Sequence, residues 1–392
     1  MDLDRDLNID FDLMDLEKKL SEKQLATMLK ARAVVQEKLQ PLINSAFESE
    51  ALPEAIPSIL GSAALLGGDL SGYGLPGLDA FEYGLIMREI ERCDSGFRSF
   101  VSVQSSLATF AIHQFGSEPQ KSEYLPHLAN GKMVGAFSLT EPQGGSDPAS
   151  MLTEACFENG RWILTGKKRW VTNAMLSDLI VVWAKTANGI RGFIVPSKSK
   201  GVHIKPIKSK LSMKASQSCE IDFEQVELKE NALLPLSKGL GSALKCLNQA
   251  RYGIIWGVLG AAEACLDETI RYVKKRVLFN RPLSSFQLIQ AKLSDAYRDL
   301  TLAQLYAFEL ALLKESGSIM PAQISLGKAN NVEVALRIAR NCRDILGGNG
   351  ILMDFQTMRH MVNLETVSTY EGTHDVHRLI VGQYLTGDNA FL

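Results

Sequence analysis

Hydrophobic residues recur at helical spacing over the first third of the chain. Between residues 16 and 48 the repeat includes Leu25, Met28 and Ala33, and similar patterns return over 78–92 and 97–114. Spacings of three and four residues place such side chains on one face of a helix. The first third of the chain is therefore predicted to be helical.

The pattern changes to short β-type runs between residues 136 and 234. These runs are 162–164, 179–183, 192–195 and 220–223. The pairs Asn159-Gly160 and Asn188-Gly189 are typical of the tight turns that connect antiparallel strands. No helices alternate with the strands, which argues against a parallel, doubly wound sheet. We expect an antiparallel β domain.

Helical spacing returns after the polar stretch 234–239. Long helices are predicted over 242–278, 284–315 and 321–346, the last beginning with Pro321. A short helix is predicted over the apolar positions 376–385. The predicted fold class is α+β, with a helical domain (1–133), a middle β domain (134–236) and a helical bundle (237–392).

Composition and charge exclude several classes of protein. The 392 residues are 46% hydrophobic and 22% charged, which indicates a globular chain of two or three domains. A net charge of -2 and a pI near 6.3 give no electrostatic reason to expect nucleic acid or a membrane surface as a partner. The apolar run 254–262 ends at Glu263, short of the roughly 20 residues of a spanning helix. We predict no membrane insertion.

Cysteine spacing and the N-terminal residues indicate the compartment. The six cysteines are scattered without a CxxC pair, as expected of reduced intracellular thiols, and they predict no zinc site. The acidic start, residues 1–6, resembles neither a secretory signal nor an Arg-rich transit peptide. The expected location is the cytoplasm of a bacterium, or the mitochondrial matrix if the chain is a processed eukaryotic protein.

A single carboxylate stands out near the C-terminus, in Thr369-Tyr370-Glu371-Gly372-Thr373. Thr373 is a suitable N-cap for the helix that follows, so Glu371 would project from a short turn. Such a turn can present a catalytic base or can be simple structural punctuation. The pattern alone leaves both open.

Other motifs are equally ambiguous by themselves. The loop 139–148 combines hydroxyls with paired glycines, which suits a planar or phosphorylated ligand but also a plain surface loop. The segment 169–173 places a tryptophan near a threonine. The stretch 72–77 matches the GxGxxG pattern but has no strand before it, so we interpret 72–77 as a loop. His374 and His377 lack a third ligand, and no metal site is predicted. Arg251 could neutralise a carboxylate or form a surface pair.

Taken together and in order, four motifs resemble the acyl-CoA dehydrogenase family from about residue 20 to the C-terminus. They are the stretches 139–147, 170–173, 346–350 and 370–373. The resemblance implies an N-terminal helical domain, a middle β domain and a C-terminal four-helix bundle, assembled as a homotetramer. It also implies FAD as cofactor, an acyl-CoA as substrate and electron-transferring flavoprotein as electron acceptor.

The segment 91–106 is similar to that of the glutaryl-CoA dehydrogenase branch of this family. By that resemblance Glu371 is the base that removes the α-proton, and Tyr370 and Glu91 line the decarboxylating site. Arg98 and Ser102 would hold the distal carboxylate of the substrate, and Arg251 is also placed in the substrate site. Glutaryl-CoA would be oxidised and decarboxylated to crotonyl-CoA and CO₂. The alternative for Arg98 is a helical i,i+4 pair with Asp94.

The resemblance also assigns a cofactor site. Its residues would be Thr140, Ser146, Trp170, Thr172, Arg276, Phe279, Gly347, Gly348 and Thr373. Thr140, Thr172 and Trp170 would meet the isoalloxazine ring, whereas Arg276, Gly347 and Gly348 would reach the adenosine half across a subunit boundary.

Several positions depart from the family pattern. Leu278 and Asn280 replace the usual glutamine and glycine after Arg276, Phe97 replaces a common tyrosine, and Lys214 replaces a common arginine. Two rival functions stay open: a short-chain acyl-CoA dehydrogenase or oxidase, and a catalytically silent flavoprotein. A nicotinamide enzyme is a distant third.

Overall fold

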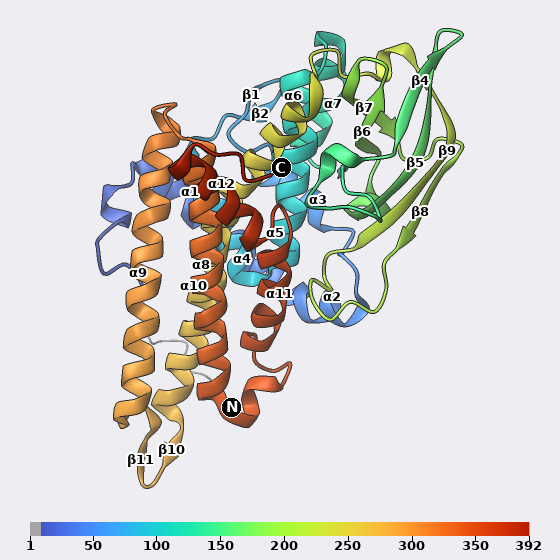
Figure 1. Ribbon diagram of the computed structural model, residues 1–392. Helices are drawn as coiled ribbons and strands as arrows, with labels where there is room; N and C mark the ends of the chain where they lie inside the picture. The colour runs from blue at the N-terminus through green and yellow to red at the C-terminus, as the bar shows by residue number, and fades with distance from the viewer. Residues whose placement is uncertain (1–8, 392) are drawn as a thin grey trace.

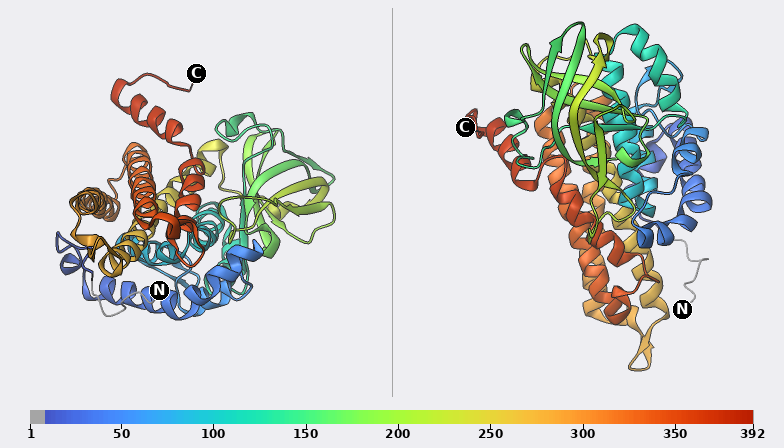
Figure 2. Two further views of the ribbon diagram at one scale, coloured as in Figure 1. Left: turned by 90° about the horizontal axis from the view of Figure 1, so that it is seen from below. Right: turned by 90° about the vertical axis from the view of Figure 1, so that its right-hand side faces the viewer.

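The computed structural model describes residues 9–391 and consists of two helical parts and a β domain (Figure 1). The predicted α+β arrangement, helical then β then helical, is confirmed. Figure 2 shows that the β domain lies against one flank of the helices, while the long C-terminal helices extend away from it. The acidic residues 1–6, on which the prediction about targeting segments rests, lie outside the described residues.

The N-terminal part is helical, as predicted. Its helices are α1 (Glu22–Val34), α2 (Ile43–Ser49), α3 (Ile56–Ser62), α4 (Ala80–Cys93), α5 (Ser95–Val101), α6 (Phe110–Phe115) and α7 (Glu118–Ala129). The predicted helix over 97–114 is α5 and α6 joined without a break by the π-helical turn η4 (Ser102–Thr109). The GxGxxG stretch is a small hairpin, β1 (Ser71–Gly72) and β2 (Leu75–Pro76), so its interpretation as a loop is confirmed.

The β domain contains one seven-stranded sheet. Its strands are β3 (Gly135–Ser138), β4 (Glu154–Glu158), β5 (Arg161–Thr172), β6 (Leu179–Thr186), β7 (Gly189–Pro196), β8 (Val202–Pro206) and β9 (Ser218–Lys229). The strand order is β3-β6-β4-β5-β9-β8, with β7 paired to β6. The prediction of a wholly antiparallel sheet is wrong at two places, because β3 and β4 each pair with β6 in parallel. Strand β3 enters from helix α7 rather than from a hairpin, so its direction is not set by a local turn.

Both predicted hairpins form. Asn159 and Gly160 connect β4 and β5 with positive φ angles of 51° and 77°, as a two-residue hairpin turn requires. In the second hairpin Thr186 pairs with Gly189, so the loop residues are Ala187 and Asn188. The turn therefore lies one residue earlier than predicted.

The C-terminal part is built from long helices. They are α8 (Gly239–Lys275), α9 (Gln287–Glu315), α10 (Pro321–Leu346), α11 (Thr357–Thr369) and α12 (His374–Thr386). A hairpin of β10 (Val277–Leu278) and β11 (Arg281–Pro282) joins α8 to α9 at the end of the bundle furthest from the sheet (Figure 1). Only one short helix was predicted here; α11 is the second, and it ends at Thr369, two residues before Glu371.

The two helical parts share one hydrophobic core, which contains Ile86 of α4, Ile255 of α8 and Ala335 of α10. Alternate residues of β6 point to opposite faces of the sheet. Val181 and Trp183 pack against the helical side, whereas Ile180 and Val182 pack inside the β domain. Four segments meet near this junction: helices α4, α5 and α8 and the turn before α12. None of the helices that the structure describes has the length and apolar character needed to cross a bilayer.

Candidate active site

Glu371 lies in the turn between α11 and α12. Its backbone is left-handed, with φ 52°, and Gly372 follows at φ 101°. The Thr373 hydroxyl accepts a hydrogen bond from the backbone N–H of Val376 at 3.2 Å, so Thr373 is the N-cap of α12 as predicted. A left-handed non-glycine residue is uncommon and must be held by its surroundings. The turn directs the Glu371 side chain inward, away from both helix axes.

The Glu371 carboxylate is poorly solvated. Its Oε2 atom is buried and has no hydrogen-bond partner. Burial raises the pKa of Glu371 above its ordinary value, while the positive charges of Arg98, Arg251 and Lys328 oppose the rise. A carboxylate that is desolvated and still ionisable is a suitable proton acceptor.

Arg98, Glu91 and Tyr370 form one buried network. Arg98 Nε donates to Glu91 Oε2 at 2.6 Å, and Arg98 Nη2 donates to the Tyr370 hydroxyl. Arg98 and Glu91 are fully buried. Burial disfavours the Arg98 charge, but the adjacent Glu91 raises the pKa of Arg98 above its ordinary value, so the guanidinium stays charged. Burial also raises the pKa of Tyr370, so its phenol stays protonated.

The alternative pairing of Arg98 with Asp94 is wrong. Asp94 is extended and separates α4 from α5, and its carboxylate accepts hydrogen bonds from Arg359, Asn363 and the Gly96 N–H. The break turns α5 relative to α4 and brings Arg98 beside Glu91 instead.

Several polar atoms in this region have no partner within the described residues. They are Arg98 Nη1, Glu91 Oε1, Ser102 Oγ and Glu371 Oε2. Ser102 follows Arg98 by four residues on the continuous helix, so the two side chains share a face. Buried polar groups are almost always hydrogen-bonded, so a cluster of unpaired ones indicates a ligand site.

Helix α8 forms the floor of this region. Arg251 is buried, and its Nε donates to the backbone carbonyl of Glu371 at 2.7 Å, which excludes the surface pair considered from the sequence. A Cβ atom at Gly257 would lie 2.1 Å from Glu91 Oε2 and 3.2 Å from Arg98 Nε. Sequence reasoning missed Gly257, because the contact depends on how α8 packs against α4.

Lys328 of α10 was also missed. It is fully buried, and its Nζ donates to the carbonyls of Gly372 at 2.8 Å, Tyr370 at 3.1 Å and Ser368 at 3.4 Å. A signal was present in the sequence, since Ile324, Lys328, Asn331 and Ala335 follow helical spacing on the buried face. A lysine on an apolar helix face is a candidate for a buried functional group.

The β domain holds the residues assigned to the flavin ring. The backbone N–H of Arg169 donates to the carbonyl of Thr140 at 2.9 Å, so the loop 139–148 lies beside the end of β5. Trp170 sits at a bulge of β5 with φ 63°, and 53% of its surface is exposed. Within the described residues the hydroxyls of Thr140 and Thr172 make no hydrogen bond. An exposed indole with free hydroxyls nearby fits a planar ring system with hydrogen-bonding edges.

A buried ion pair holds this loop in place. Lys168 Nζ donates to Glu141 Oε1 and to the Leu139 carbonyl, each at 2.9 Å. Glu141 is desolvated, but backbone N–H groups at 152 and 153 and the Lys168 charge outweigh that effect and lower its pKa to about 2. Ser146, further along the loop, is exposed.

Four other residues assigned to the cofactor do not lie near the loop 139–148 and the end of β5 of the same chain. Arg276, Phe279, Gly347 and Gly348 lie at the far end of the bundle (Figure 1). Phe279 is 87% exposed, and a Cβ at Gly347 or Gly348 would meet nothing within 4 Å. Asn280, the departure from glycine, has φ 62°, a conformation that asparagine tolerates better than most residues. The hairpin turn therefore survives the substitution.

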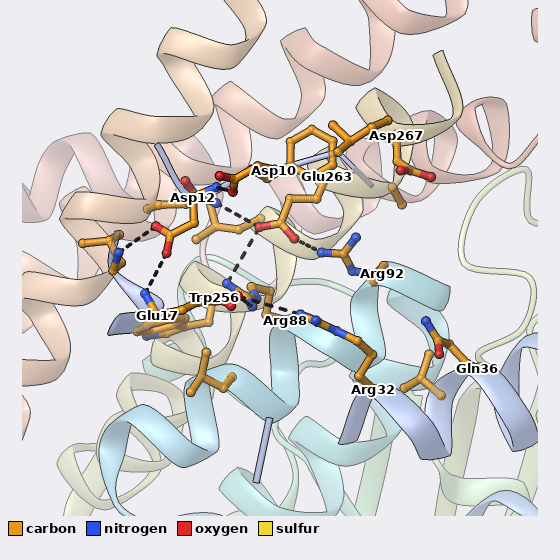
Figure 3. Close-up of a pocket in the computed structure, with 18 of the residues that line it drawn as sticks. Asp10, Asp12, Glu17, Arg32, Gln36, Arg88, Arg92, Trp256, Glu263 and Asp267 are labelled. Carbon is orange, nitrogen blue, oxygen red and sulfur yellow. Dashed lines mark hydrogen bonds and ion pairs between the residues drawn. The ribbon is translucent and has the colours of Figure 1, made fainter. Parts of the chain in front are cut away.

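A separate cavity lies elsewhere in the molecule. About 850 Å³ in volume, it opens on the other side of α4 and α8 and is lined by residues such as Arg88, Arg92, Trp256 and Glu263 (Figure 3). Several of its charged groups are already paired with one another, as in Arg92 with Glu263. The faces of α4 and α8 that carry Glu91 and Gly257 point away from it.

Comparison with known proteins agrees with this arrangement. Family models of the acyl-CoA dehydrogenase N-terminal, middle and C-terminal domains match residues 21–132, 136–226 and 237–386. A solved structure of glutaryl-CoA dehydrogenase from Mycobacterium smegmatis in complex with FADH2 is 46% identical, with a TM-score of 0.96, covering 97% of this chain and 99% of that chain.

Two further relatives are more distant. The mitochondrial short-chain specific acyl-CoA dehydrogenase of Mus musculus is 32% identical over 364 residues, 90% of this chain and 88% of its own length. A structure described as the electron transferring flavoprotein of Acidaminococcus fermentans is 30% identical, with a TM-score of 0.90, covering 94% of this chain and 99% of that one.

Proposed function

The chain belongs to the acyl-CoA dehydrogenase family and is an FAD-dependent enzyme, and from this premise we propose that it oxidises and decarboxylates glutaryl-CoA to crotonyl-CoA and CO₂. Electrons would pass to electron-transferring flavoprotein. The likeness to the mycobacterial glutaryl-CoA dehydrogenase, at 46% identity, supports the choice of acyl group.

One observation carries the proposal: a fully buried arginine lies beside the candidate base with one unpaired nitrogen, Arg98 Nη1. An uncharged short acyl chain would leave that nitrogen unsatisfied, at a cost of about 1–3 kcal/mol. A carboxylate at the distal end of the acyl group would accept from Arg98 Nη1 and from Ser102 Oγ. Glutaryl-CoA carries such a carboxylate, whereas butyryl-CoA does not.

Glu371 takes the proton from the α-carbon of the thioester. Its desolvated carboxylate is a stronger base than an exposed glutamate, and closing the site around substrate would strengthen it further. Bound FAD supplies the acceptor for the hydride that leaves the β-carbon. Thr140, Thr172 and Trp170 would hold its ring, and their free hydroxyls and exposed indole fit that task.

Decarboxylation follows from the position of the distal carboxylate. After oxidation the carboxylate stands on the γ-carbon, next to the new α,β double bond, so the bond between the γ-carbon and the carboxylate can break with its electron pair delocalised into the enoyl thioester as a dienolate. CO₂ leaves, and the proton held by Glu371 returns to the γ-carbon to give crotonyl-CoA. Tyr370 and Glu91 share hydrogen bonds with Arg98, so they would set where the carboxylate rests before it is lost.

The two halves of the cofactor site support a homotetramer. Thr140 and Trp170 lie in the β domain, whereas Arg276 and Gly347 lie at the far end of the bundle (Figure 1). One FAD can contact both sets only if a second copy of the chain supplies one of them. Exposed apolar residues at that end, such as Phe279, would then be covered by the partner.

Substrate competition tests the choice of acyl group. We expect kcat/KM for glutaryl-CoA to exceed that for butyryl-CoA, and an Arg98→Met variant to lose this preference by about 10²-fold or more, because the charge-assisted contact from Arg98 Nη1 disappears. Butyryl-CoA is the internal control, since it makes no contact with the guanidinium. If wild type prefers butyryl-CoA, the enzyme is a short-chain acyl-CoA dehydrogenase instead.

A further inference from the structure

We propose that Lys328 is a positioning residue for the catalytic turn: its buried ammonium holds the backbone on both sides of Glu371 and so aims the carboxylate at the substrate. This inference rests on the proposed role of Glu371 as base. No motif assigns Lys328 a role, and it comes from α10, far in sequence from the turn that it contacts.

The geometry matches the number of donors to the number of acceptors. An ammonium has three N–H donors, and Lys328 Nζ reaches three carbonyls, at 368, 370 and 372, which lie before and after Glu371. Arg251 Nε takes the carbonyl of Glu371 itself. Every carbonyl from 370 to 372 is therefore bonded to a buried cation, which restrains the left-handed conformation at φ 52°.

Lys328 also contributes charge, but mainly below about pH 7, because burial lowers the pKa of its ammonium to about 7. The groups that face it are Glu371 in the turn, Arg251 on α8, Arg98 on α5, and His374 and His377 on α12. Glu371 is the only acidic group among them. Burial lowers the pKa of His377 to about 3, so this ring is neutral, and its nitrogens have no partner within the described residues. The ammonium therefore acts on the base with little competition from other carboxylates.

A purely structural explanation exists and must be separated from positioning. Ser368 and Tyr370 lie at the end of α11, where carbonyls lack intrahelical partners and a lysine often satisfies them. A cap of this kind would affect stability alone. A positioning residue affects, in addition, the proton affinity and the aim of Glu371.

Two variants separate the contribution of the Lys328 charge from that of its N–H donors. Lys328→Met keeps the volume but removes the charge and all donors, whereas Lys328→Gln removes the charge and one donor and keeps two N–H donors. Asn331→Ala is the matched control, since Asn331 is buried on the same helix and its amide bonds the carbonyls of Ile255 and Ala303, away from the turn.

The measurement is the rate of flavin reduction against pH, with whichever of glutaryl-CoA and butyryl-CoA the wild type oxidises faster. We expect Lys328→Met to lower the limiting rate about 10- to 100-fold, because a misplaced base reacts slowly. The acid limb should move up by about one pH unit, because a nearby positive charge is lost. Lys328→Gln should show the same shift with a smaller loss of rate, and Asn331→Ala should lose thermal stability without a shift.

An unshifted acid limb in both Lys328 variants, with only a lower melting temperature, would overturn the proposal and leave the capping role. Its failure is distinguishable from failure of the proposed function. If the wild type reduces its flavin with butyryl-CoA and not glutaryl-CoA, the choice of substrate is wrong, yet the pH shift still tests Lys328.

Discussion

At the scale of single residues, the proposed catalysis depends on one carboxylate with a raised pKa, that of Glu371. Burial raises the pKa of Glu371, and three cations limit the rise. The base works only when it is ionised, so activity should fall as the pH drops through the raised pKa. We expect this acid limb above about 4.3, where an exposed glutamate titrates.

Glu371→Gln should lower the rate of flavin reduction about 10²- to 10⁴-fold, because the amide cannot accept the proton. Substrate binding should persist, because Arg98 and Ser102 are unchanged. The check is stopped-flow reduction together with equilibrium binding of the acyl-CoA. Turnover equal to wild type would support the rival interpretation, a catalytically silent flavoprotein.

Individual residues were predicted from the sequence with unequal success. The position of Glu371 in a capped turn follows from local pattern, because Thr373 and the apolar repeat after it are adjacent. Arg98 was assigned to the pocket by resemblance, but its partner Glu91 follows from the break at Asp94, which periodicity does not reveal. Helical spacing marks Lys328 as a residue of a buried face but does not give its partners, and the contact of Gly257 depends wholly on how two distant helices pack.

At the scale of elements, the packing of α8 against α4 fixes the substrate end of the site. Gly257→Ala would place a Cβ 2.1 Å from Glu91 Oε2, so the Glu91–Arg98 pair must move. We expect kcat/KM for glutaryl-CoA to fall about 10²-fold, as for other small displacements of a positioning group. Oxidation of butyryl-CoA should change much less.

Gly253→Ala is the control for this prediction. Its Cβ would lie 3.0 Å from the flexible end of Met87 and from the Tyr83 hydroxyl, one turn earlier on α8, and Glu91 is not among its near contacts. Equal losses in the two variants would mean that alanine disturbs the helix packing in general, and the assigned role of Gly257 would be wrong.

Long elements were the easier part of the fold to predict. Helix α10 begins at Pro321 and ends at 346 as expected, because a proline start and a strong repeat mark it. The parallel pairing of β3 with β6 was missed, since strand direction across a long connection depends on tertiary packing. The short helix α11 was missed because polar side chains, those of Arg359, His360 and Asn363, occupy much of its buried face.

At the scale of the whole molecule, the separated halves of the cofactor site predict complementation between subunits. A variant altered at Trp170 and Thr172 and a second altered at Arg276 and Phe279 should each retain little FAD. When the two variants assemble together, the second supplies an intact β domain and the first an intact bundle end, so one of the shared sites is complete. About a quarter of all sites should recover flavin if the copies mix at random in two-fold symmetric pairs.

Flavin content after co-expression and gel filtration measures this recovery. Complete absence of recovery in assemblies shown to contain both variants would mean that each chain binds its own FAD. The arrangement in Figure 1 would then require a different cofactor path.

The most direct test of the central claim is an anaerobic titration of the holoenzyme with glutaryl-CoA, following flavin bleaching and released CO₂ together. If the enzyme oxidises and decarboxylates glutaryl-CoA, each reduced flavin is accompanied by one CO₂ and one crotonyl-CoA. Bleaching without CO₂ would contradict the decarboxylating role of Tyr370 and Glu91, and bleaching by butyryl-CoA as readily as by glutaryl-CoA would contradict the role of Arg98.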